Sequence, residues 1–140
     1  MTNSKILICM TDLPFPARKN GISIRYQPII SHLSKSFLID LVVISNHPVG
    51  REEIAEARKY CSSVNFYLRK KQKVPIAFKI LARTLSLFPS SGPFVYFRYD
   101  EKEIEKFVQG VTKGKKYKAA LCVSMDYVST IKNNVFILAA

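Results

Sequence analysis

The sequence predicts a single α/β domain, residues 1–140, built on a Rossmann-like parallel sheet with helices on both faces. Short apolar runs alternate along the chain with segments of helical apolar spacing, and such alternation is typical of a parallel sheet. The hydrophobic fraction of 48% is enough to bury a proper core. Five glycines, seven prolines and the lack of low-complexity tracts or repeats favour one compact unit.

The first predicted strand is the continuous apolar run 5–11, which has the pattern of a strand buried on both faces. Residues 12–21 hold two prolines, an Arg-Lys pair and an Asn-Gly dipeptide, so a loop follows. Helical spacing then predicts a helix ending near Lys35, in which Pro28 favours a late start or a kink. Its apolar stripe consists of Tyr26, Ile29, Ile30, Leu33 and Phe37.

Strand and helix patterns continue to alternate through the rest of the chain. A β-rich run at 37–45 predicts the second strand, 52–60 has the composition of a surface helix, and 64–68 predicts the third strand. After the aromatic run 94–98, another helix is expected, with carboxylates in its first turn. Its carboxylates are Asp100, Glu101 and Glu103, and its stripe is Ile104, Phe107, Val108 and Val111. Two further buried-type strands are expected at 118–124 and 135–140.

Charge and composition restrict the classes of partner and the setting. A formal net charge of +12 should attract phosphate-bearing partners such as nucleic acid, nucleotides or anionic lipid headgroups. Cys9, Cys61 and Cys122 suit neither a disulfide framework nor a CxxC metal or redox pair, so we expect a reducing cytoplasm and no metal site. No stretch approaches the ~20 apolar residues of a membrane span.

Several segments of the sequence resemble a known enzyme family. They are KILICMTDLPFP with a loop closing on Gly21, ISIRYQPIISHLSK and FLIDLVVIS, and later FVYFRYDEKEIEKFV before YKAALCV. Together they resemble the start of bacterial group 1 (family 4) glycosyltransferases, which are retaining GT-B enzymes. The resemblance covers nearly the whole chain, whereas the family's donor-binding region with its paired glutamates is absent from it.

The resemblance implies an acceptor-side domain. In the family, the N-terminal Rossmann-like domain mainly binds the acceptor, a second domain binds the nucleotide-sugar donor, and catalysis occurs in the cleft between them. We therefore expect a hexosyltransferase type of enzyme when complete, acting on a glycan or lipid-linked acceptor without a metal or other cofactor. The chain stops at a predicted strand, so we expect a C-terminal donor domain beyond Ala140, or encoded separately, and little activity from this chain alone.

Site candidates follow from the same resemblance. Gly21 occupies the position where backbone without a Cβ can approach a substrate phosphate or sugar, although Asn20 stands where many members have a second glycine. Arg18 and Arg25, with Lys19, flank this position and suit an anionic acceptor, and ordinary surface charge accounts for them equally well.

Asp126 is the catalytic candidate. It follows the predicted strand 118–124, where relatives often place a polar residue facing the cleft, and a carboxylate there can accept a proton from an acceptor hydroxyl. Helix capping is the alternative role for this side chain. The two histidines, His32 and His47, are expected to be structural or exposed.

A basic segment adds a possible membrane surface. RKKQK at 69–73 precedes VPIAFKILARTLSLF, and clustered cations beside an amphipathic helix are typical of contact with an anionic membrane. The expected contacts are Arg69, Lys70, Lys71, Lys73, Lys79 and Arg83. The alternative is that this helix packs on the sheet. The membrane reading places the protein in the cytoplasm, peripherally on the inner face of the cytoplasmic membrane.

Other functions fit the sequence less well. The cations are spread along the chain, FVYF lacks the surrounding ribonucleoprotein signature, and no zinc-finger spacing occurs, so nucleic acid is not an expected partner. A single glycine after the first strand cannot form the GxGxxG turn of a dinucleotide enzyme. The alternative function is a non-catalytic basic α/β module that binds an anionic membrane or nucleic acid.

Overall fold

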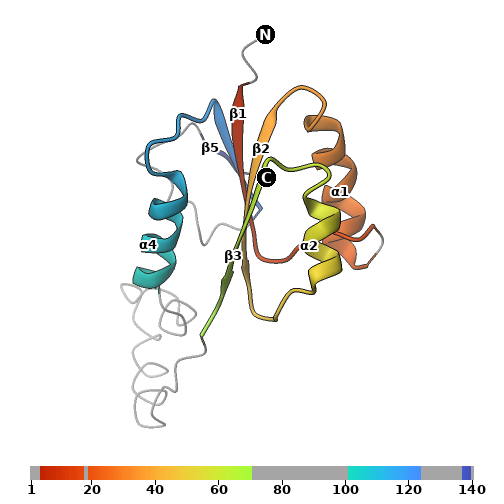
Figure 1. Cartoon of the computed structure of the whole chain (residues 1–140), viewed down its shortest axis with the longest axis horizontal. Helices are drawn as coiled ribbons and strands as arrows, with labels where there is room; N and C mark the ends of the chain where they lie inside the picture. Colours follow the sequence, from red (N-terminus) through yellow and green to blue (C-terminus); the bar gives the residue numbers. More distant parts are fainter. Residues whose placement is uncertain (1–3, 18, 71–100, 124–136, 140) are drawn as a thin grey trace, which may run out of the picture.

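The computed structural model describes residues 4–17, 19–70, 101–123 and 137–139, and these form a sheet flanked by helices (Figure 1). The strands are β1 (Lys5–Met10), β2 (Leu38–Ser45), β3 (Ser63–Leu68), β4 (Ala119–Cys122) and β5 (Ile137–Ala139). The helices are α1 (Gly21–Leu33), α2 (Arg51–Ala57) and α4 (Glu101–Thr112). The predicted segments 76–88 and 94–98 lie outside the described residues.

The sheet has the strand order β3-β2-β1-β4-β5, and each neighbouring pair is parallel. Ile6 of β1 is in register with Ile39 of β2 and with Ala119 of β4. The order runs outward from β1 in both directions, so the topological switch lies between β1 and β4. The predicted Rossmann-like α/β fold is confirmed.

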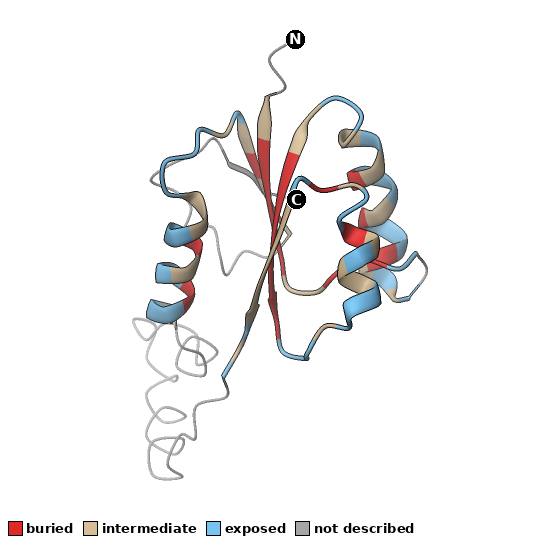
Figure 2. Cartoon of the chain, viewed as in Figure 1, coloured by how far each residue is buried: buried red, intermediate tan, exposed pale blue. Residues whose placement is uncertain are grey.

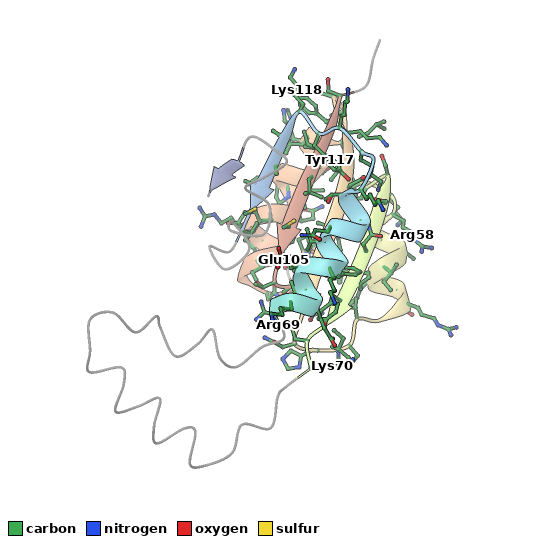
Figure 3. The ribbon with its side chains drawn as sticks, turned by 90° about the vertical axis from the view of Figure 1, so that its left-hand side faces the viewer. Arg58, Arg69, Lys70, Glu105, Tyr117 and Lys118 are labelled. Atoms are coloured by element: carbon green, nitrogen blue, oxygen red, sulfur yellow. The ribbon has the colours of Figure 1, made fainter. Side chains whose placement is uncertain are left out.

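Alternating residues of the central strands supply two separate cores (Figure 2). On one face, Ile8 and Leu41 pack in a cluster that includes Tyr26 and Ile30 of α1. On the other face, a second cluster joins the intervening strand residues to α4; its members include Leu7, Cys9, Val42, Ile44, Ile104 and Val108. Figure 3 looks onto the face that α4 covers. Both faces are therefore buried, which is why β1 and β2 read as continuous apolar runs.

The start of α1 is set by a capping box, not by Pro28. Asn20 caps the helix, its side chain accepting from the Ser23 backbone N–H while the Ser23 hydroxyl oxygen accepts from the Asn20 backbone N–H. The helix therefore begins at Gly21 and continues through Pro28 to Leu33, so of the two alternatives for Pro28, a late start or a kink, the late start is wrong. The helix ends two residues before Lys35.

The predicted apolar stripe of α1 is only partly correct. Tyr26 and Ile30 are buried, and Leu33 and Phe37 pack against the same core, but Ile29 is 40% exposed. Phe37 lies beyond the end of α1, at the approach to β2. The stripe predicted for α4 is confirmed. Ile104 and Val108 are buried, and Phe107 and Val111 pack against them.

All three cysteines are free and buried. Cys9 and Cys122 are register partners on β1 and β4, and the hydrogen bond between them together with burial raises the pKa of Cys9. Burial, followed by the charge of Asp40, raises the pKa of Cys61 to about 12. The thiols of Cys9 and Cys61 therefore stay protonated at neutral pH and act as small apolar groups.

Candidate functional site

The candidate site lies at the carboxyl edge of the sheet, beside the switch between β1 and β4. Open α/β sheets bind ligands at this position, because the loops that follow the two diverging strands form a crevice there. The described residues at this edge include 11–17 and 19–20 of the loop that joins β1 to the first turn of α1. The segment that follows Val123 lies outside the described residues.

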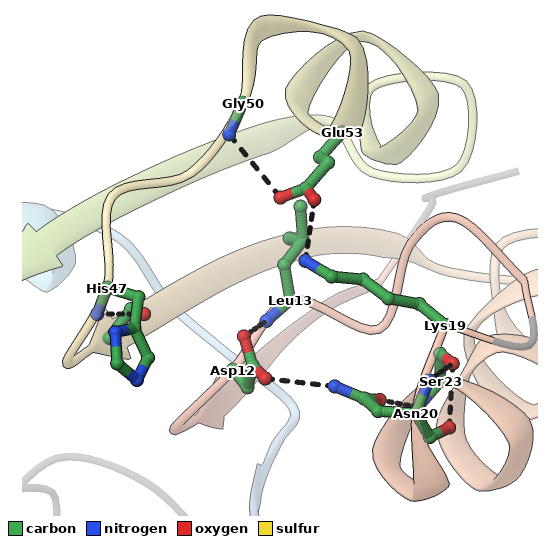
Figure 4. Close-up of polar contacts among 9 residues, drawn as sticks. Asp12, Leu13, Lys19, Asn20, Ser23, His47, Gly50 and Glu53 are labelled. Atoms are coloured by element: carbon green, nitrogen blue, oxygen red, sulfur yellow. Dashed lines mark hydrogen bonds and ion pairs between the residues drawn. The ribbon is translucent and has the colours of Figure 1, made fainter.

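A chain of hydrogen bonds shapes this loop (Figure 4). One oxygen of Asp12 accepts from the Leu13 backbone N–H, and its other oxygen accepts from the Asn20 side-chain amide, both at 2.9 Å. The Asn20 oxygen in turn accepts from the Ser23 backbone N–H at 2.8 Å. Asp12 is thereby oriented at the end of β1 by the same residue that caps α1.

An ion pair ties this loop to the neighbouring helix. The Lys19 ammonium group binds Glu53 of α2, and the second oxygen of Glu53 lies 3.4 Å from the Gly50 backbone N–H (Figure 4). The pair is partly exposed, so it adds at most about 1 kcal/mol to the free energy of unfolding. Its main effect is to fix the position of the loop relative to α2.

Gly21 is the first residue of α1, and its backbone is open to solvent. A Cβ at this position would meet no atom within 4 Å, and the residue does not adopt the left-handed conformation that favours glycine. Neither backbone conformation nor packing therefore requires glycine here. Arg25 lies one turn further along, exposed, with its guanidinium 5.5 Å from the centre of the Tyr26 ring.

The structure brings together three of the residues predicted for acceptor or phosphate binding. Asn20, Gly21 and Arg25 all lie at the start of α1. The Asn20 side chain, however, is engaged in the capping box and with Asp12, so we now assign it a positioning role. Arg18 and the catalytic candidate Asp126 lie outside the described residues.

Two of the residues predicted for the membrane surface are described. Arg69 and Lys70 follow β3, and Lys70 lies 3.7 Å from Glu103 in an exposed ion pair with α4. Glu103 also accepts from the Tyr67 hydroxyl at 2.8 Å, and these contacts lower its pKa. Lys70 is thus partly neutralised. Lys71, Lys73, Lys79 and Arg83 lie outside the described residues.

Asp12 and Glu53 are the site residues that the sequence interpretation missed. A carboxylate directly after the first buried strand was a usable signal for Asp12, because that position falls at the carboxyl edge of a parallel sheet. Glu53 gave no such signal, since it looks like an ordinary acidic residue in the first turn of a helix.

A small hollow lies at the carboxyl ends of β2 and β3. Its volume is about 140 Å³, below the roughly 300 Å³ typical of ligand pockets, and His47 and Phe66 are among its lining residues.

His32 and His47 are exposed, in line with the expectation for both. Within the described residues, no group of three or more His, Cys, Asp or Glu is placed to hold a metal ion. Every helix in that same part of the chain is too short or too polar to cross a bilayer.

Comparisons with known proteins identify the fold. No family model matches the chain, and no curated protein matches it. Among solved structures, it is similar to the C-terminal domain of a hydrogenase from Pyrococcus furiosus, with a TM-score of 0.57 and 9% identity over 100% of this chain and 94% of that one. At 9% identity this likeness bears on architecture alone, and it agrees with a Rossmann-like α/β domain.

Proposed function

We propose that this chain is the N-terminal, acceptor-side domain of a GT-B glycosyltransferase that moves a sugar from a nucleotide-sugar to a glycan or lipid-linked acceptor. Two features support the proposal: the resemblance of the stretches 5–45 and 94–123 to family 4 enzymes, and the Rossmann-like sheet with the β1–α1 loop at its switch point. The donor diphosphate is assigned to a second domain.

The observation that carries the proposal is Gly21. A glycine at the first position of a helix is less stable than alanine unless conformation or space requires it, and neither does so here. Its bare backbone is exposed at the first turn of α1, where a phosphate or sugar can approach the first N–H groups of the helix. Function therefore accounts for this glycine better than folding does.

Neighbouring side chains give the site its chemistry. Asp12 is held by Leu13 and Asn20, and its carboxylate can still accept a hydrogen bond from a sugar hydroxyl. Arg25 is exposed at the same end of α1 and offers a planar fork of donors to an anionic group. Asp126 remains the proposed base that takes the proton from the acceptor hydroxyl.

Gly21→Ala tests this assignment. We expect the variant to keep or raise the melting temperature, since alanine favours the helix, and to weaken acceptor binding by roughly tenfold or more because the added methyl blocks close approach. Binding would be measured on an array of oligosaccharides and sugar phosphates, followed by calorimetry on the members that bind. Ser31→Ala, which also raises helix propensity but lies far along α1, is the control and should bind as the wild type does.

Two results would contradict the proposal. Equal binding by wild type and Gly21→Ala would remove the functional reason for the glycine. Tight binding of UDP-glucose or GDP-mannose by this chain would point to a self-sufficient donor site, whereas the proposal expects donor binding only after a donor domain is added.

We propose that the protein is held peripherally on the cytoplasmic face of the membrane. The net charge of +12 and the run RKKQK support attraction to anionic lipid. Co-sedimentation with phosphatidylglycerol vesicles should fall with rising salt and should fall further in a variant with Lys70, Lys71 and Lys73 changed to Gln. A control variant has Lys35, Arg58 and Lys102 changed to Gln. If its co-sedimentation with vesicles falls by the same amount, net charge alone, and not the position of the lysines, explains the binding.

A further inference from the structure

A second site candidate lies at the opposite edge of the sheet. There, the end of α4 and the loop leading to β4 surround an open hollow of about 880 Å³. Because α4 runs against the direction of the strands, its last turn lies at their amino edge, far from Gly21. Figure 3 shows the two edges of the sheet, with Tyr117 and Lys118 at one end of the molecule and Arg69 and Lys70, which follow β3, at the other.

The hollow is basic, and none of its described lining residues is acidic. Lys106, Lys113, Lys115 and Lys116 contribute to its wall. The last turn of α4 holds no basic residue, but Lys113 directly follows the helix, where the helix dipole favours a cation. One cation is enough for that role, whereas all four lysines line the same concavity. Within the described residues, Lys106, Lys113 and Lys116 have no ion-pair partner.

The base of the hollow is held in a fixed geometry. Lys115 and the Tyr117 hydroxyl both donate to the same carboxylate oxygen of Asp40, at 2.9 Å and 2.7 Å respectively. Asp40 is itself buried in the sheet, and Ser63 donates to its second oxygen at 2.8 Å. One lysine is thus tethered to the core, while the other three line the same hollow.

Gly110 adds an independent observation. It lies inside α4, is exposed and lines the hollow, and a Cβ there would meet no atom within 4 Å. Glycine destabilises a helix interior more than any residue except proline, so helix stability does not explain Gly110. Packing does not explain it either, because no neighbouring atom would exclude a side chain. Its absence of a side chain leaves the wall of the hollow open to a ligand. Gly114, by contrast, has φ +74°, and its conformation alone accounts for glycine at the end of the helix.

We propose that this hollow binds a group of two or more linked phosphates, carried by a small molecule or by a lipid headgroup. Several ammonium groups around one concavity match several negative charges on one compact ligand. The volume lies in the range of small-molecule sites. A nucleic acid would instead need a stripe of cations along an extended face. The proposal rests on residues at the amino edge and is independent of the acceptor site.

Calorimetric titration of the full chain with sodium tripolyphosphate tests the proposal. A variant with Lys106, Lys113 and Lys116 changed to Gln should bind at least roughly tenfold more weakly, because three charge-assisted contacts are removed. The control changes Lys35, Arg58 and Lys102 to Gln, which lowers the net charge of +12 by the same three units at residues that do not line the hollow. It should stay within about threefold of the wild type at physiological salt.

The outcomes separate the sources of the phosphates and the competing explanations. Binding of tripolyphosphate supports a soluble ligand, and lysine-dependent binding to phosphatidylcholine vesicles carrying a lipid pyrophosphate supports a headgroup. Equal losses in the two triple variants, no binding by the wild type, or tighter binding of a single-stranded oligonucleotide than of tripolyphosphate would overturn the proposal. Melting curves of both variants confirm that they fold. The variant with Lys106, Lys113 and Lys116 changed to Gln should bind neutral oligosaccharides as the wild type does, so failure at one site is distinguishable from failure at the other.

Discussion

Phe15→Ala is expected to lower the free energy of unfolding by about 4 kcal/mol, the largest effect of any single change considered. Phe15 is fully buried although it belongs to the β1–α1 loop, and its ring stacks on Tyr60 with centroids 5.3 Å apart and planes 7° from parallel. Truncation removes the apolar surface, the ring contact and the filled volume together. Urea unfolding at neutral pH measures the difference.

Phe15→Leu is the matched control for this change. It keeps an apolar side chain of similar volume and loses only the ring contact, so we expect a cost of about 1.5 kcal/mol or less. A loss below about 1 kcal/mol in Phe15→Ala would contradict the anchoring role. Hydrogen exchange supplies a second readout, because a loosened loop should also expose the Ser23 amide that Asn20 now protects.

The anchoring of this loop matters for the candidate site. Within this loop, a hydrogen bond joins the side chains of Asp12 and Asn20, and the side chains of Leu13 and Phe15 are buried in the core. The carboxyl-edge wall is thus fixed from two directions, by polar contacts at the crevice and by apolar packing beneath it. For the ligand contact proposed at Gly21, a loop that is already fixed lowers the entropy cost of binding.

Much of the fold could be predicted because its strands follow simple rules. Runs such as 6–10 and 41–44 are apolar at every position because α1, α2 and α4 cover both faces of the sheet, and this pattern is typical of a parallel arrangement. The order β3-β2-β1-β4-β5 agrees with the Rossmann-like prediction. The errors were local. Ile29 looked like a core residue by spacing, but α1 turns it toward solvent.

The candidate sites were less predictable, because they depend on contacts between distant residues. The capping box of Asn20 is visible in sequence, yet its bond to Asp12 depends on the path of the loop between them. The basic hollow joins α4 to the loop before β4, and its tether, Asp40, is 75 residues from Lys115. In sequence, Asp40 is an isolated charge within an apolar strand, and no local pattern shows which partners neutralise it.

Asp40 is the second position where a large effect is expected, since its carboxylate unites three partners inside the sheet. Burial alone would raise its pKa, but hydrogen bonds from Lys115, Tyr117 and Ser63, with the charge of Lys115, outweigh burial and lower the pKa below its ordinary value. Burial is the largest cause that raises the pKa of Tyr117, and its hydrogen bond to Asp40 and the charge of Asp40 raise it further. The Tyr117 hydroxyl therefore stays protonated and remains a donor. The ionised carboxylate is therefore the form that the folded state stabilises.

Asp40→Asn should accordingly lower the free energy of unfolding by about 3 kcal/mol at pH 7, where the ionised carboxylate makes charge-assisted hydrogen bonds. Because the folded-state pKa of Asp40 is depressed, this contribution is fully present above the unfolded value near 3.9 and is lost as the pH falls through the folded-state pKa. Urea unfolding of wild type and variant should therefore differ strongly at pH 7 and converge in strong acid. Glu105→Gln, on the exposed face of α4, should show a small difference at both pH values. A difference for Asp40→Asn that is equally large in strong acid would mean that packing, and not charge, holds Lys115 at the base of the basic hollow.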